Sequence, residues 1–175
     1  YQIFNEPNAG WTDNSEKEWY AKSTIEVYNK LKETNKYKRT VVGSVAIKYL
    51  EEKESIDYLT DIGAKYGALK ESNTFAYHMY TSQENMQRLK EVTEYANEAI
   101  NNIGGFTNIY VNEMGITSSD DITEIDRIQK IIKQMVTYIN YGISKVYIYD
   151  FRDTDKEDGT SRYGIVTNDY IPKES

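Results

Sequence analysis

Two glutamates follow short apolar segments, at the places where predicted strands end. Glu6 comes after the aromatic and β-branched residues 1–4, and Glu113 closes the segment 108–113. A charge at the end of a buried strand is costly unless something uses it. Paired carboxylates suit cleavage of a glycosidic bond, because one can protonate the leaving oxygen while the other attacks the anomeric carbon. We therefore expect Glu6 and Glu113 to share one site, and a separation of about 5–5.5 Å would indicate retention of configuration.

Other polar side chains also gather where predicted strands end. They are Asn5, His78, Tyr80, Asn112, Asp150, Arg152 and Asp153. Ligands of parallel α/β folds bind at the carboxyl ends of the strands, so this edge is where we expect the substrate. His78 and Tyr80 are two residues apart and therefore face the same side of their strand.

Strands and helices alternate along the chain. Apolar and β-branched runs predict strands at residues 1–4, 40–46, 74–80, 108–113 and 145–151. Apolar periodicity predicts helices at residues 14–35, 56–67, 82–103 and 123–142, with Ser82 as a cap of the third and Thr123 at the start of the fourth. This alternation favours a parallel sheet whose strands are connected by crossover helices.

Five parallel strands fit either an open doubly wound sheet or part of a (β/α)8 barrel. No glycine-rich phosphate loop follows a predicted strand, which counts against a nucleotide-binding sheet. No linker, repeat or low-complexity tract divides the sequence. We therefore expect residues 1–175 to form a single domain.

Composition excludes several functional classes. The 175 residues carry a net charge of −7 without a cluster of lysine or arginine, so nucleic acid and anionic membranes are poor partners. The absence of cysteine and the presence of one histidine exclude disulfides, thiolate zinc sites and sites with several imidazoles. No apolar run approaches the roughly 18 residues of a membrane span. The sequence indicates no cofactor, and its 17 tyrosines suit stacking on polar ligands.

Four segments, in order, resemble motifs of the clan A glycoside hydrolases, which are (β/α)8 TIM barrels. Residues 1–8 (YQIFNEPN) look like the strand-4 motif, in which Asn-Glu-Pro presents the acid/base. Residues 75–80 (FAYHMY) are similar to strand 6, and residues 109–115 (IYVNEMG) are similar to strand 7, which carries the nucleophile. Residues 163–173 are similar to the segment that leads into the last helix. Family 39-like and family 5-like branches both fit this pattern.

The resemblance implies roles for the residues that match. Glu6 would be the acid/base and Glu113 the nucleophile of a retaining enzyme that cleaves β-glycosidic bonds of a polysaccharide or oligosaccharide. Asn5 would bind the sugar 2-hydroxyl, an interaction that strengthens in the transition state. Tyr80 or His78 would support the nucleophile or a sugar hydroxyl.

Further substrate-binding candidates lie in the loops. Trp11 could stack on a pyranose ring, although a loop tryptophan can also simply cover the barrel rim. The family usually has an aromatic residue, often tryptophan, at the end of strand 8, and here Tyr149 or Phe151 would take that place. Arg152 is also a candidate, with an ion pair to Asp150 as the structural alternative.

The resemblance also implies that the chain is the C-terminal portion of a glycoside hydrolase catalytic domain. A complete barrel typically needs about 250 residues. The motifs match strands 4 to 8, so strands 1 to 3 would lie outside this sequence. Unpaired barrel edges invite pairing with another chain, so we expect these 175 residues alone to self-associate. Secretion is expected from the resemblance only.

Two other functions remain open from the sequence. One is a non-catalytic carbohydrate-binding domain derived from such a barrel, because the end of strand 8 is atypical. The other is a metal-dependent α/β enzyme in which Glu6, Glu113 and Asp150 hold Mg²⁺, an ion that prefers oxygen ligands.

Overall fold

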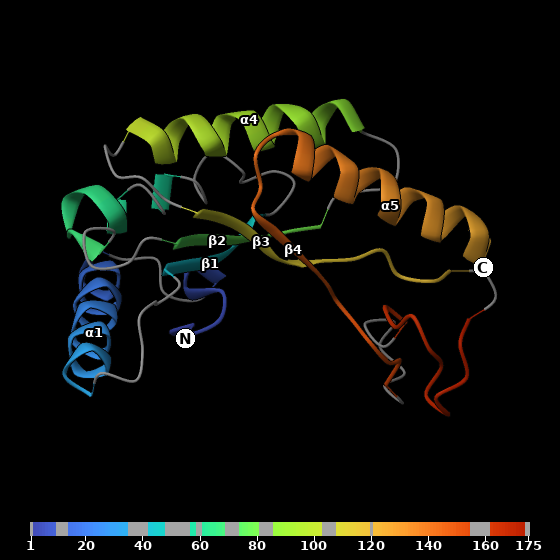
Figure 1. Ribbon diagram of the computed structural model, residues 1–175, viewed down its shortest axis with the longest axis horizontal. Helices are drawn as coiled ribbons and strands as arrows, with labels where there is room; N and C mark the ends of the chain where they lie inside the picture. Colours follow the sequence, from blue (N-terminus) through green and yellow to red (C-terminus); the bar gives the residue numbers. More distant parts are fainter. Residues whose placement is uncertain are drawn as a thin grey trace.

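The computed structural model has a parallel sheet with helices packed against it. It describes residues 2–9, 14–34, 42–47, 57–58, 61–68, 74–80, 86–102, 108–119, 121–154 and 162–173. The four strands, β1 to β4 in order, span Val42–Ile47, Thr74–Met79, Asn108–Met114 and Lys145–Ile148. They lie side by side in the order β1-β2-β3-β4, and every neighbouring pair is parallel (Figure 1). This is a mixed α/β fold, consistent with part of an α/β barrel.

The helices follow the predicted pattern. They are α1 (Asn14–Glu33), α4 (Met86–Asn102) and α5 (Glu124–Asn140), with short turns η1 (Pro7–Ala9) and η2 (Asp61–Lys65). Thr123 is the expected start of α5 and caps it, because its hydroxyl oxygen accepts from the backbone N–H of Asp126 at 3.1 Å. The cap expected at Ser82 lies outside the described residues. A helix was expected at residues 56–67. The structure describes residues 57–58 and 61–67 of it, and η2 forms a π-helical turn there. None of the described helices is long and apolar enough to cross a membrane.

Two predicted strands are shorter than expected. In the run 1–4, Tyr1 lies outside the described residues, Gln2 forms a single bridge, and Phe4 leaves the extended conformation with φ of 62°. The last strand ends at Ile148 rather than at residue 151. The reason is a change of partner: after Ile148 the backbone of Asp150 and Phe151 pairs with residues 163–166. Tertiary pairing therefore overrides the local β preference after Ile148.

The core lies between the sheet and the two helices α4 and α5, which cover one face of it (Figure 1). Side chains from both layers are buried there, among them Phe75, Tyr77, Leu89, Val92, Ala96, Ile109, Val111, Ile131 and Tyr138. Because side chains alternate along a strand, Tyr110 and Asn112 face the other side of β3. The residues of β2 are buried on both faces, whereas Tyr110 and Asn112 of β3 are only partly buried.

Candidate active site

Glu6 lies in a constrained turn before η1. Its φ is 45°, in the left-handed region that non-glycine residues rarely adopt. The turn is closed by Ala9, whose N–H donates to the Glu6 carbonyl at 2.9 Å, and Pro7 is buried. The Phe4 ring packs 5.3 Å from the Trp19 ring of α1. Such strain persists only where the surroundings enforce it, and it is concentrated at functional sites.

His78 brings the two glutamates together. Its Nδ1 lies 2.9 Å from Glu6 Oε1 and 3.5 Å from Glu113 Oε2. The imidazole is 1% exposed, whereas the side chains of Glu6 and Glu113 are 31% and 23% exposed. His78 and Glu113 are direct neighbours in the β2–β3 register, at a bulge that follows Tyr77. The carboxylates thus share one site and stay open to solvent, while the histidine beneath them is shielded.

Tyr80 fixes the second carboxylate. Its hydroxyl donates a hydrogen bond to Glu113 Oε1. Burial, and then the hydrogen bond to Glu113, raise the pKa of Tyr80 well above its usual range. Tyr80 therefore remains a protonated donor across the physiological pH range, and Glu113 is held between Tyr80 and His78.

Three tyrosines surround Glu113. The Tyr163 ring lies edge-on to the rings of Tyr80 (5.6 Å) and Tyr149 (5.7 Å). Burial, and then the neighbouring Tyr149 and Glu113, raise the pKa of Tyr163. Burial, and then Asp150 and Glu113, raise the pKa of Tyr149. Sequence reasoning named Tyr149 but assigned no site role to Tyr163, whose only signal was its place in the last matching motif.

Asn5 belongs to a chain of amides beside Glu6. Gln2 Nε2 donates to Asn5 Oδ1 at 3.4 Å, and Asn112 Nδ2 donates to Gln2 Oε1 at 2.9 Å. A cavity of about 250 Å³ lies next to them, lined by Gln2, Asn112, Tyr110 and Tyr147. Polar groups and tyrosine rings in this combination suit a hydroxyl-rich ligand.

For two predicted substrate-binding residues, Trp11 and Arg152, the described part of the structure gives no contact with Glu6 or Glu113. Trp11 lies outside the described residues. The Arg152 guanidinium stacks over the Tyr170 ring, 4.7 Å from its centroid, and no ion pair joins it to Asp150 in the described part of the chain. The ion pair with Asp150, which was the structural alternative for Arg152, was therefore wrong, and the partner of Arg152 is the Tyr170 ring.

A metal would find its donors in the same place. Among the described residues, Glu6, His78 and Glu113 each offer one ligand atom, and these atoms lie within 4.8 Å of one another. His78 takes the position that the sequence hypothesis gave to Asp150, and a nitrogen donor suits Mg²⁺ poorly. The hydrogen bond between His78 and Glu6 accounts for their closeness without an ion.

The sequence matches one family. Residues 3–164 match the family model described as glycosyl hydrolase catalytic core. Among curated proteins, none matches this chain.

Solved glycosidase structures share the fold. A family 39 glycoside hydrolase from the gut symbiont Bacteroides cellulosilyticus WH2 is 16% identical, with a TM-score of 0.69 over 98% of this chain and 38% of its own. A GH2 beta-galacturonidase from Eisenbergiella tayi is 17% identical, with a TM-score of 0.64 over 98% and 30%. Bacteroides uniformis beta-glucuronidase 2, covalently bound to cyclophellitol-6-carboxylate aziridine, is 13% identical, with a TM-score of 0.68 over 98% and 22%. The chain therefore spans less than two fifths of each of these proteins.

Proposed function

Because this chain belongs to the glycosyl hydrolase catalytic core family, we propose that it supplies the acid/base and the nucleophile of a retaining β-glycosidase. The observation that carries the proposal is the position of His78 Nδ1, 2.9 Å from Glu6 and 3.5 Å from Glu113. Oxygens of the two carboxylates lie within 4.8 Å of each other. Retaining enzymes keep their carboxyl groups about 5–5.5 Å apart, whereas inverting enzymes need about 6.5–9.5 Å to admit a water molecule.

The surroundings of each carboxylate support a division of roles. Glu113 accepts the Tyr80 hydrogen bond, which holds its carboxylate in place for attack on the sugar. Glu6 is the more exposed of the two and contacts His78, so it can exchange protons with a leaving group or with water. Glu113 attacks the anomeric carbon as the bond to the leaving oxygen breaks, and Glu6 gives that oxygen its proton. Glu6 then takes a proton from a water molecule as the water oxygen attacks the anomeric carbon, and the bond from that carbon to Glu113 breaks.

Other residues would bind the sugar. Asn5 precedes the acid/base and would bind the 2-hydroxyl, and its hydrogen bond from Gln2 supports this role. The exposed Tyr149 beside Glu113 would serve as the platform at the end of strand 8, and Trp11 and Arg152 would act further out. We take the substrate to be a β-linked polysaccharide or oligosaccharide, in keeping with the names of the beta-galacturonidase and beta-glucuronidase of similar fold.

The chain would be one part of a larger catalytic domain. In this proposal residues 1–175 form a single unit that covers strands 4 to 8 of a (β/α)8 barrel, with Glu6 after strand 4. The neighbours that match 98% of this chain with only 22–38% of their own length support it. Without the rest of the barrel, these residues would self-associate, which sedimentation velocity would detect. The outer face of α5 supports this, because four large aliphatic side chains are exposed there: Ile125, Ile132, Val136 and Ile139.

Chemical rescue by azide tests the two roles in the full-length protein. With an activated aryl β-glycoside, Glu6→Ala should yield the β-glycosyl azide, because azide attacks the glycosyl–Glu113 intermediate. Glu113→Ala should yield the α-glycosyl azide, because azide then replaces the nucleophile on the opposite face. The anomeric configuration is read by nuclear magnetic resonance. An α-glycosyl azide from Glu6→Ala and a β-glycosyl azide from Glu113→Ala would reverse the two roles. Wild-type activity in a Glu6→Ala, Glu113→Ala double variant would refute both roles.

A further inference from the structure

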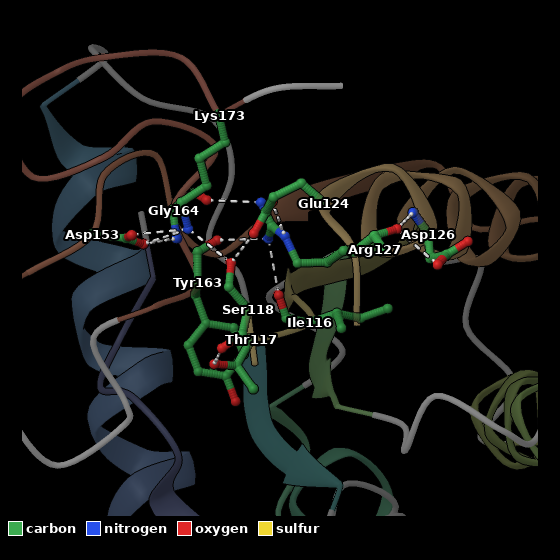
Figure 2. A network of polar contacts seen from close by, with 11 residues as sticks. Ile116, Thr117, Ser118, Glu124, Asp126, Arg127, Asp153, Tyr163, Gly164 and Lys173 are labelled. Carbon is green, nitrogen blue, oxygen red and sulfur yellow. Dashed lines mark hydrogen bonds and ion pairs between the residues drawn. The ribbon is translucent and has the colours of Figure 1, made fainter. Parts of the chain in front are cut away.

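A buried arginine connects α5 to the segment behind the site. Arg127 is fully buried in the first turn of α5. Its Nε donates to Glu124 Oε2 at 2.7 Å. One terminal nitrogen donates to the carbonyl oxygens of Ile116 (3.0 Å) and Tyr163 (3.4 Å), and the other donates to that of Gly164 (2.9 Å) (Figure 2). A buried guanidinium needs acceptors for its donors, and here most of them are backbone carbonyls of two separate segments.

A second group of side chains holds the same segment from its other side. Asp153 Oδ1 accepts from the Gly164 N–H at 2.8 Å, and Lys173 pairs with Asp153 at 2.8 Å. Lys173 also donates to Ser118 Oγ at 2.9 Å, and Ser118 donates to Glu124. Figure 2 shows that the network closes on itself, because Glu124 is the partner of the buried arginine. Both the N–H and the carbonyl of Gly164 are therefore fixed.

The ring carried by this segment reaches the candidate nucleophile through one neighbour. The Tyr163 ring packs edge-on against the Tyr80 ring at 5.6 Å. Tyr80 in turn donates its hydroxyl to Glu113. Such aromatic contacts are directional, so a displaced Tyr163 ring would let Tyr80 move.

We propose that Arg127 is a positioning residue for the nucleophile. Through the carbonyls of Tyr163 and Gly164 it fixes the Tyr163 ring, and that ring keeps the Tyr80 hydroxyl on Glu113. The inference rests on the proposed function, in which Glu113 attacks the sugar. If Arg127 only stabilised the fold, its replacement would leave the rate of attack by Glu113 unchanged in the molecules that are folded.

The test is a double-mutant cycle in the full-length protein, measured as the rate at which activated 2-fluoro glycosides label Glu113. The probes are the β-glucoside, the β-galactoside, the β-xyloside, the β-glucuronide and the β-galacturonide. Mass spectrometry follows the labelled fraction of folded protein. Arg127→Lys keeps the charge but loses the planar fork, and we expect labelling to slow about 100-fold. Tyr163→Ala should slow labelling by a similar factor. In the Tyr163→Ala background, Arg127→Lys should change the rate by less than about threefold, because both act through one ring.

The control is Lys133→Ala, an exposed position on the same helix, which should label at the wild-type rate. Wild-type labelling by folded Arg127→Lys, with only the melting temperature lowered, would overturn the inference, as would additive effects in the cycle. If Arg127→Lys does not fold, Tyr163→Ala decides alone, because unchanged labelling in that variant also overturns it. If no probe labels the wild-type protein, the proposed function itself is contradicted. That result differs from failure of the Arg127 inference, in which the wild-type protein is labelled.

Discussion

His78 Nδ1 lies 2.9 Å from Glu6 Oε1, and the imidazole that makes this contact is 1% exposed. The contact joins the turn after residue 4 to the end of β2, so two segments far apart in the sequence meet at one nitrogen atom. The same atom is 3.5 Å from Glu113 Oε2. His78 therefore sets the spacing of the two carboxylates on which the proposed chemistry depends.

Replacement of His78 should separate the role of this nitrogen from that of the ring. An asparagine can place its amide N–H or its carbonyl oxygen near the position of Nδ1, whereas a glutamine reaches toward that of Nε2. We expect His78→Gln to lower kcat/KM for an aryl β-glycoside by about 10- to 100-fold and His78→Asn by less than about tenfold. Steady-state kinetics of both variants and of Gln129→Ala, an exposed control on α5, check this. Equal losses in the two His78 variants would count against it.

Tyr80→Phe should slow the reaction without changing the shape of the site. A hydrogen bond to a charged group contributes about 1.5–3 kcal/mol, which corresponds to about 10- to 100-fold in kcat/KM if it is formed fully in the transition state. The matched control is Tyr95→Phe, because the Tyr95 hydroxyl also donates to a carboxylate, that of Asp57 at 3.2 Å. That variant should keep wild-type kinetics. A Tyr80→Phe enzyme as fast as the control would contradict the role given to this hydroxyl.

Gly115 and Gly142 should respond differently to alanine. A Cβ at Gly115 would lie 2.1 Å from the Tyr149 carbonyl oxygen and 3.0 Å from the Tyr163 ring, so the site must shift. At Gly142 there is open space but φ is 83°, and alanine there costs about 1–2 kcal/mol of backbone strain. We expect Gly115→Ala to reduce kcat/KM at least about tenfold, while Gly142→Ala lowers only the free energy of unfolding. Calorimetry and kinetics on both variants test the contrast, which equal activities would refute.

The start of α5 was predictable from the sequence because its signal is local. Thr123 specifies where that helix begins. The apolar residues do not specify which face is buried, because Ile132 and Ile139 are exposed while Arg127 and Gln134 are buried. The closeness of His78 and Glu113 was predictable for a topological reason, because they lie in parallel neighbouring strands. Parallel strands bring their carboxyl ends to one edge, whatever the distance in sequence.

The rest depends on contacts that no local pattern encodes. The left-handed φ of Glu6 follows from packing around Phe4 and Pro7, which the sequence does not show. Arg127 reads as an ordinary charged helix residue, yet it is fully buried because distant carbonyls surround it. The role of Tyr163 arises from the same long-range pairing.

Alkaline pH should destabilise the fold through its buried tyrosines. Burial raises the pKa of Tyr77 well above its usual value, and burial with the neighbouring Tyr77 does the same for Tyr138. Above about pH 10 the unfolded chain loses these protons while the folded chain keeps them, so stability present below that pH is lost as pH rises. The free energy of unfolding should fall by up to about 1.4 kcal/mol per pH unit for each tyrosine.

Urea denaturation of the full-length protein between about pH 9 and 11 measures this slope. Tyr77→Phe should make the decrease of the unfolding free energy with pH less steep by the contribution of one tyrosine, because phenylalanine has no hydroxyl proton to lose. Ile109→Val is the control, since it alters the same buried layer without removing a titratable group and should leave the slope unchanged. A Tyr77→Phe slope equal to that of the wild type would contradict the assignment.

The identity of the residue that carries a trapped sugar tests the central claim most directly. The full-length protein is treated with the activated 2-fluoro β-glycoside that inactivates it, digested, and sequenced by mass spectrometry. We predict an adduct on Glu113 that is absent from Glu113→Gln and that prevents turnover. Turnover that continues without an adduct, or an adduct on any other residue, would contradict a retaining mechanism in which Glu113 is the nucleophile.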